Sequence, residues 1–259
     1  MTFPVYFHLG GVRVHPHPVM EVIAYSGGFQ LYRRLRPKFP SAALPFEANL
    51  WIIIGALSGA LAGSKILALA ESAPEFWAHR DNLLFLMGGK TIVGGLLGGW
   101  LGVEIAKHFV GVKHSTGDAF VFPLIFGMAV GRVGCFLTGL DDHTYGVATS
   151  LPWAVDFGDG IRRHPTQLYD IVFLCVLAII LWPRRRSGPN GQLFLLFVAS
   201  YCAWRFAVEY LKPSWKPIGL SAIQIAVVVG FTASFLRLVR RRWSFPSEEL
   251  PNADASHCA

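Results

Sequence analysis

The chain has 259 residues, of which 53% are hydrophobic and only 15% charged, and its mean hydropathy is +0.45. This balance is too apolar for the surface of a soluble domain of this size, so a membrane protein is predicted. The net charge of +7 does not indicate nucleic-acid binding, because the basic residues form short clusters beside apolar segments. Membrane topology and anionic lipid headgroups are sufficient to explain such clusters.

Seven apolar segments have about the length that a helix needs to cross a bilayer, roughly 20 residues. In chain order they are 18–32, 48–70, 83–105, 118–139, 168–183, 191–211 and 218–238. No long linker or internal repeat divides them, so the sequence predicts an all-α polytopic membrane protein with a single transmembrane domain, residues 1–243. Residues 244–259 are expected to form a disordered cytoplasmic tail.

Basic residues flank these segments unevenly. Clusters follow the first, third, fifth and seventh segments: Arg33, Arg34, Arg36 and Lys38; Lys107 and Lys113; Arg184, Arg185 and Arg186; Arg237, Arg240, Arg241 and Arg242. Because Lys and Arg beside membrane helices are retained on the cytoplasmic side, the N-terminus is predicted outside and the C-terminus inside. The beginning of the chain lacks the features of a cleaved signal peptide, so the first segment is expected to stay in the membrane.

Glycines recur at four-residue spacing in the second and third segments. They are Gly55, Gly59 and Gly63 in the second, and Gly94 with Gly98 and Gly95 with Gly99 in the third. Small residues at this spacing allow two membrane helices to approach closely, so we interpret them as packing positions. Lys65 and Lys90 lie close enough to segment ends for their ammonium groups to reach the interface, and no functional role is predicted for them.

The fourth segment places Arg132 between Gly131 and Gly134. A charge at membrane depth costs several kcal/mol and needs a partner or a wet cavity. Neighbouring glycines leave room beside the guanidinium, which can form paired hydrogen bonds with phosphate oxygens. We predict that Arg132 binds a phospholipid phosphate and that Gly131 and Gly134 line the substrate site. A purely structural role for Arg132 is the alternative.

The external stretch before the fifth segment ends in RHPTQLYD at 163–170. His164 supplies an imidazole that can act as acid, base or phosphate ligand. Gln167 and Tyr169 add hydrogen-bonding groups and are predicted to contact substrate. The alternative is that His164 makes an ordinary polar contact and that Tyr169 anchors the helix at the interface.

The sixth segment contains Arg205 and Glu209, four residues apart and therefore on one helix face within reach of each other. They can form a buried structural ion pair, which contributes little net stability. The functional alternative is that Arg205 joins Arg132 in binding a phosphodiester, with Glu209 orienting the guanidinium.

The four cysteines, Cys135, Cys175, Cys202 and Cys258, show no CxxC spacing. Neither a disulfide nor a zinc site is predicted from this pattern, and no cofactor is implied. Cys135 has no base beside it in the sequence and is not predicted to be a nucleophile.

Three stretches, in this order, resemble the prolipoprotein diacylglyceryl transferase family: GRVGCF at 131–136, RHPTQLYD at 163–170 and RFAVE at 205–209. The second is similar to the family's RHPSQLYE and is the most specific of the three. The resemblance extends over roughly residues 88–212. The seven-span, N-outside topology that it implies agrees with the charge distribution.

The resemblance implies transfer of a diacylglyceryl group from phosphatidylglycerol to the lipobox cysteine thiol of a prolipoprotein, with release of glycerol phosphate. It implies a multi-pass protein of the bacterial cytoplasmic (inner) membrane, whose partners are phosphatidylglycerol, other membrane lipids and the signal peptide of the prolipoprotein. Catalytic roles are implied for Arg132, Arg205, Glu209 and His164, without metal, cofactor or nucleic acid.

This sequence also departs from the family pattern. Where the family has HGGL, this chain has Val93, followed by Gly94 and Gly95 as predicted substrate-binding positions. Cys135 stands at the Asn position of the family's GRxGNF stretch. Without a histidine in the HGGL stretch, His164 or Asp141 is the predicted base. The alternatives are a related transferase with a different acceptor, or a non-catalytic lipid-binding membrane protein.

Overall fold

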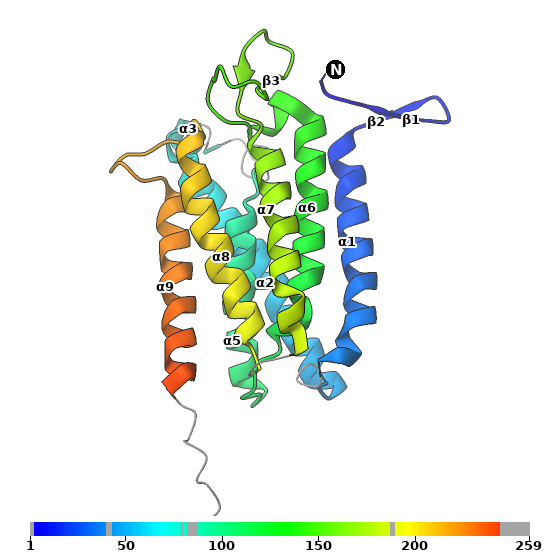
Figure 1. Ribbon diagram of the computed structural model, residues 1–259, viewed down its shortest axis with the longest axis vertical. Helices are drawn as coiled ribbons and strands as arrows, with labels where there is room; N and C mark the ends of the chain where they lie inside the picture. The colour runs from blue at the N-terminus through cyan, green and yellow to red at the C-terminus, as the bar shows by residue number, and fades with distance from the viewer. Residues whose placement is uncertain (1–2, 40–42, 79, 82–87, 187–189, 244–259) are drawn as a thin grey trace, which may run out of the picture.

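Long helices run side by side in the computed structural model, which describes residues 3–39, 43–78, 80–81, 88–186 and 190–243 (Figure 1). The long helices are α1 (Pro16–Leu35), α2 (Phe46–Glu71), α5 (Ile92–Phe109), α6 (Val121–Thr138), α7 (Thr166–Leu181), α8 (Gln192–Val208) and α9 (Ala222–Trp243). The short α3 (Ala73–Ala78) follows α2, and 3-10 turns occupy Arg36–Lys38, Gly117–Phe120, Gly139–Asp142, Pro183–Arg186 and Glu209–Leu211. Each predicted apolar segment overlaps one long helix, which confirms the all-α fold class.

Within the described ranges, four stretches are long and apolar enough to cross a membrane: Phe46–Glu71, Gly117–Asp142, Gln192–Leu211 and Ala222–Arg240. The helix Thr166–Leu181 is apolar but shorter. Large apolar side chains cover the outside of the bundle, as on α2, where Leu57, Leu61 and Ile66 are 67%, 70% and 68% exposed. An apolar exterior is ordinary in lipid, where helices satisfy their backbone groups internally. The protein is therefore a helical membrane protein.

Two helices begin later than predicted because polar residues cap them. Thr91 accepts a hydrogen bond at its Oγ1 from the backbone N–H of Gly94 at 3.2 Å, so α5 begins after it. Residues 83–87 of that predicted segment lie outside the described residues, as does the predicted tail. Before α9, Ser221 and Gln224 cap each other: the Gln224 N–H donates to Ser221 Oγ at 3.2 Å and the Ser221 N–H donates to Gln224 Oε1 at 3.0 Å.

Two short antiparallel ribbons were not predicted. In the first, β1 (Phe7–Leu9) pairs with β2 (Val12–Val14) through a turn at Gly10 and Gly11, whose φ angles are +55° and +84°. Positive φ at both positions is typical of a two-residue hairpin turn and favours glycine. In the second, β3 (Val155–Asp156) pairs with β4 (Arg162–Arg163) in the loop after α6. Strands this short give no usable alternation of apolar and polar residues.

The glycines of α2 and α5 let the two helix backbones touch. A Cβ on Gly59 would lie 2.3 Å from the carbonyl oxygen of Gly98, and a Cβ on Gly98 would lie 2.3 Å from that of Gly59. Gly55 with Gly102, and Gly63 with Gly94, repeat this contact one turn away on either side. The packing interpretation is confirmed for Gly55, Gly59, Gly63, Gly94 and Gly98, whereas Gly95 and Gly99 make only ordinary contacts with α2.

Replacing Gly98 by alanine is expected to destabilise the protein by about 1–3 kcal/mol, because the added methyl group must force two rigid backbones apart. Gly95→Ala is the matched control on the same helix, since a Cβ there meets its nearest neighbour at 3.8 Å, an ordinary contact. Thermal unfolding in detergent measures both. Equal midpoints for the two variants would contradict the close contact between α2 and α5.

Helix α8 is the central element of the core. At its start, the Asp118 carboxylate accepts hydrogen bonds from the N–H groups of Gly191 at 2.6 Å and Phe194 at 2.8 Å. Phe197 and Val198 are fully buried on the same helix. This anchoring fixes the position of Arg205 at the other end of α8, beside α6 and α7.

Candidate active site

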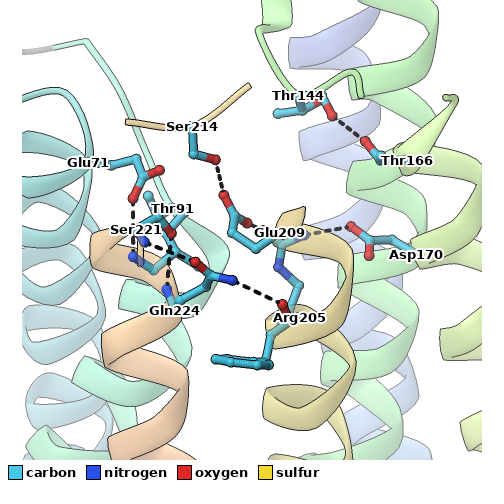
Figure 2. Close-up of polar contacts among 12 residues, drawn as sticks. Glu71, Thr91, Thr144, Thr166, Asp170, Arg205, Glu209, Ser214, Ser221 and Gln224 are labelled. Carbon is cyan, nitrogen blue, oxygen red and sulfur yellow. Dashed lines mark hydrogen bonds and ion pairs between the residues drawn. The ribbon is translucent and has the colours of Figure 1, made fainter. Parts of the chain in front are cut away.

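Two buried arginines from different helices meet at one carboxylate. The Nε atom of Arg132 on α6 lies 2.8 Å from Oδ2 of Asp170 on α7, and Nη1 of Arg205 on α8 lies 3.6 Å from the same oxygen. Nη2 of Arg205 also pairs with Glu209 Oε2 at 2.8 Å, as its four-residue spacing predicted. Figure 2 shows Arg205 reaching toward Asp170, and Glu209 reaching toward Ser214. We call Arg132, Asp170, Arg205 and Glu209 the arginine cluster.

Neighbouring side chains hold the carboxylates of the arginine cluster in place. Trp204 donates its indole N–H to Asp170 Oδ1 at 2.8 Å, and the Ser214 hydroxyl donates to Glu209 Oε1. Each carboxylate therefore uses both oxygens, one toward a guanidinium and one toward a neutral donor. Such second partners fix the orientation of the charged groups.

Several buried polar atoms in and beside the arginine cluster lack a hydrogen-bond partner among the described residues. They are Nε and Nη1 of Arg205, the hydroxyl of Tyr201, both amide atoms of Gln167, which is one turn before Asp170 on α7, and Asp170 Oδ2, whose contacts with the two arginines are ion pairs. A buried donor left unsatisfied costs about 1–3 kcal/mol, so these atoms are suited to a polar ligand. With two guanidinium groups present, an anion rich in oxygen fits best.

The predicted glycine positions differ in their surroundings. A Cβ on Gly131 would meet no described atom within 4 Å, so open space lies beside Gly131 itself. A Cβ on Gly134 would lie 2.9 Å from Met20 Cβ on α1, and one on Gly94 would lie 2.3 Å from a backbone oxygen of α2. Gly134 and Gly94 therefore make helix contacts, and a role in substrate binding stays a prediction for them and for Gly95.

The histidine predicted to act as acid or base lies apart from the arginine cluster. His164 Nδ1 is 3.1 Å from the Tyr169 hydroxyl, which also accepts a hydrogen bond from Trp153 Nε1 at 2.8 Å. In the described part of the chain, neither His164 nor Tyr169 forms a hydrogen bond or ion pair with the cluster. Their functional roles stay predictions.

Lys212 directly follows the 3-10 turn that ends α8 and was missed by the sequence analysis. Burial, followed by repulsion from Arg205 and Arg132, lowers the pKa of its ammonium to about 7, and the carboxylates of Glu209 and Asp170 act in the opposite direction. The group is therefore a cation only below about this pH. A bound anion would raise the pKa again, because it favours the charged form.

Binding of an anionic phospholipid is expected to weaken several-fold between pH 6 and pH 8, because Lys212 loses its charge across this range. Native mass spectrometry or a fluorescence titration with phosphatidylglycerol measures the affinity. Lys212→Met should remove most of the pH dependence, whereas Lys113→Met, after α5, should retain it. An identical pH dependence in both variants would show that the charge of Lys212 does not contribute to lipid binding.

Comparison with known proteins extends the resemblance to almost the whole chain. The family model described as prolipoprotein diacylglyceryl transferase matches residues 4–240. This chain belongs to the prolipoprotein diacylglyceryl transferase family. The match includes the first two apolar segments, which the three motif stretches did not reach.

Curated members of the family resemble this chain over most of their length. A protein named phosphatidylglycerol–prolipoprotein diacylglyceryl transferase from Bordetella avium is 29% identical over 227 residues, which cover 85% of each chain. A protein with the same name from Vibrio vulnificus is 32% identical over 228 residues, which cover 84% of this chain and 81% of the relative. A relative with the same name in Dehalococcoides mccartyi is 28% identical over 242 residues, covering 87% and 88%.

Asp170 is the member of the arginine cluster that the sequence analysis did not select. It closes the RHPTQLYD stretch, at the position where the prolipoprotein diacylglyceryl transferase family's RHPSQLYE has Glu. An acid within an apolar segment is itself a signal of function, because an unpaired carboxylate is costly in a membrane. A search of the fifth apolar segment for charged residues would have selected Asp170, just as Arg132 was selected in the fourth.

Proposed function

We propose that this chain transfers the diacylglyceryl group of phosphatidylglycerol to the lipobox cysteine thiol of a prolipoprotein, releasing glycerol phosphate. The observation that carries the proposal is the pair of buried guanidinium groups that meet at Asp170, with Arg205 Nε and Nη1 lacking hydrogen-bond partners among the described residues. The names of the curated relatives support the donor and the acceptor.

In this reaction the arginine cluster binds the phosphodiester. Arg205 donates to its oxygens through Nε and Nη1, which lack hydrogen-bond partners among the described residues, and the Arg132 guanidinium adds a second positive charge. Asp170 contacts both guanidinium groups, and Glu209 contacts that of Arg205. As the acceptor sulfur attacks the glyceryl carbon, the carbon–oxygen bond breaks and negative charge grows on the leaving phosphate. Donors that are already oriented stabilise this charge without rearrangement, which lowers the barrier.

We further propose that the chain is one transmembrane domain over residues 1–243, with seven spans, the N-terminus outside and the C-terminus inside the bacterial cytoplasmic (inner) membrane. The ribbon β1–β2 and β3 lie at the same end of the bundle, which supports the proposal that both are on one side of the membrane (Figure 1). Arg132 and Arg205 lie in the later parts of α6 and α8, and Asp170 lies near the start of α7. In this orientation the cluster lies nearer the outside, where the cysteine of an exported precursor arrives.

A bacterial strain depleted of its own prolipoprotein diacylglyceryl transferase tests the proposed function. Expression of this chain should add the mass of one diacylglyceryl group to a reporter prolipoprotein, and a reporter with the lipobox cysteine changed to serine should stay unmodified. If the precursor remains unmodified although the chain is in the membrane, a different acceptor or a lipid-binding role is favoured.

A further inference from the structure

A histidine, a cysteine and an aspartate converge beside the arginine cluster. His17 on α1, Cys135 on α6 and Asp142 in the turn after α6 each offer one ligand atom, and these atoms lie within 4.8 Å of one another. Cys135 is buried, and the side chains of His17 and Asp142 are 32% and 11% exposed. Cys135 also interacts electrostatically with Arg132. We call these three residues the His–Cys–Asp group.

Nδ1 of His17 faces a carboxylate oxygen. It lies 3.4 Å from Asp142 Oδ1, is buried, and lacks a hydrogen-bond partner among the described residues. The other ring nitrogen, Nε2, lies 3.4 Å from Glu21 Oε1. If the ring proton is on Nε2 beside Glu21, the Nδ1 lone pair points at Asp142. Two electron-rich atoms then face each other, and a cation between them removes the repulsion.

The surroundings orient the other ligands as well. The Thr144 hydroxyl donates a hydrogen bond to Oδ2 of Asp142, so the carboxylate turns Oδ1 toward His17. Glu21 is held in turn by Lys90, whose Nζ lies 3.2 Å from Glu21 Oε1. A histidine ligand that donates its second N–H to a carboxylate is the usual outer-shell arrangement of a metal site.

We propose that His17, Cys135 and Asp142 bind a zinc ion whose fourth position is open to the acceptor thiol. One sulfur, one nitrogen and one oxygen ligand suit zinc, and three protein ligands with an open position are typical of catalytic rather than structural zinc. The role of the open position rests on the proposed function, whereas the metal site itself does not. Zinc at this place would favour the thiolate form of the acceptor. Val93, which stands where the family has a histidine, cannot act as the base that removes the thiol proton.

The transfer step balances without a further reactant. On binding zinc, the acceptor thiol releases its proton to solvent and its sulfur becomes a thiolate. The sulfur electron pair forms the carbon–sulfur bond to the glyceryl carbon, and the carbon–oxygen bond breaks with its electron pair on oxygen. The products are the thioether, the glycerol phosphate dianion and one proton. Cys135 as the nucleophile instead would form a stable thioether on the enzyme, from which no transfer follows.

Metal content tests the site directly. The full-length chain, purified in detergent with a tag that lacks histidine and then dialysed against zinc, should contain one zinc per chain by mass spectrometry of the elements. Cys135→Ser and His17→Gln should each lose it, whereas Cys175→Ser, at an exposed cysteine on α7, should retain it. Circular dichroism confirms that the variants are folded. No bound zinc, or equal zinc in Cys135→Ser and Cys175→Ser, would refute the site.

The variant Glu21→Gln tests whether His17 is a metal ligand supported by Glu21 or only part of a network of ion pairs. Weakening the contact to His17 Nε2 should lower zinc affinity roughly 10–100-fold, as for other outer-shell changes. Glu47→Gln, an exposed acid in the first turn of α2, should leave the affinity unchanged. If the two variants bind zinc equally, Glu21 does not support a metal ligand.

Cobalt in place of zinc reports on the open position. The cobalt-loaded chain should show a sulfur-to-cobalt absorption band that is absent from Cys135→Ser and that increases when a lipobox peptide is added, but not its serine analogue. A cobalt band without thioether formation from phosphatidylglycerol would retain the metal site and contradict the proposed function. Thioether formation at an unchanged rate after removal of all metal would support the proposed function and contradict the role of zinc in activating the thiol.

Discussion

Arg132→Lys and Arg205→Lys are each expected to lower the rate of diacylglyceryl transfer roughly 100- to 1,000-fold, the loss typical of removing an oriented donor from a developing anion. Lysine preserves the positive charge opposite Asp170 and Glu209, so the fold should survive. It removes the planar fork that donates to two phosphate oxygens at once, and this geometry is what the lipid site requires.

Arg184→Lys is the control for these variants, because Arg184 is an exposed arginine in the turn after α7, where its Nη1 donates to the Ile180 carbonyl at 2.9 Å. Its transfer rate should equal that of the unmodified chain. The amounts of folded protein must also match, as judged by unfolding midpoints. Full activity in both Arg132→Lys and Arg205→Lys would show that paired hydrogen bonds to phosphate are not needed.

Asp170→Asn is expected to reduce stability by roughly 3–5 kcal/mol and to abolish transfer, because it leaves two buried guanidinium groups with one carboxylate between them. Asp170 is only 1% exposed, so water cannot replace the lost charge. The amount of protein recovered from membranes and the midpoint of thermal unfolding measure the effect. Asp170→Glu, which restores the family's residue at this position, should retain the fold.

Asp159→Asn is the matched control for the loss of a carboxylate. Asp159 pairs with Arg163 at 2.7 Å, but it lies in an exposed loop, where solvent screens the interaction. Its unfolding midpoint should hardly change. If Asp170→Asn is as stable as Asp159→Asn, the arginine cluster does not depend on Asp170 for its charge balance.

The sequence predicted the helices well because lipid imposes a simple rule. A spanning helix needs a long apolar stretch, and all seven predicted segments overlap long helices in the described ranges. The pair Arg205–Glu209 was also predictable, since four-residue spacing places both side chains on one helix face. Helix ends were less accurate, because Thr91 and Ser221 cap α5 and α9 inside the apolar stretches.

Contacts between helices could not be predicted from the same patterns. Nothing in the spacing of Arg132 and Arg205 shows that both approach Asp170, because this depends on which faces of α6, α7 and α8 meet. His17 and Cys135 are similarly distant in sequence and adjacent in space. Cysteine spacing did not indicate the His–Cys–Asp group, because the group has one cysteine and its histidine comes from α1, far away in the sequence.

The most direct test of the account is a reaction of purified components. The chain is incubated with phosphatidylglycerol and a peptide containing a lipobox cysteine, and mass spectrometry searches for the diacylglyceryl thioether, with Arg132→Ala as the control. Thioether and glycerol phosphate are expected in equal amounts, and both should be lost in Arg132→Ala. No thioether with the folded chain, or the same yield from Arg132→Ala, would contradict transfer at the arginine cluster.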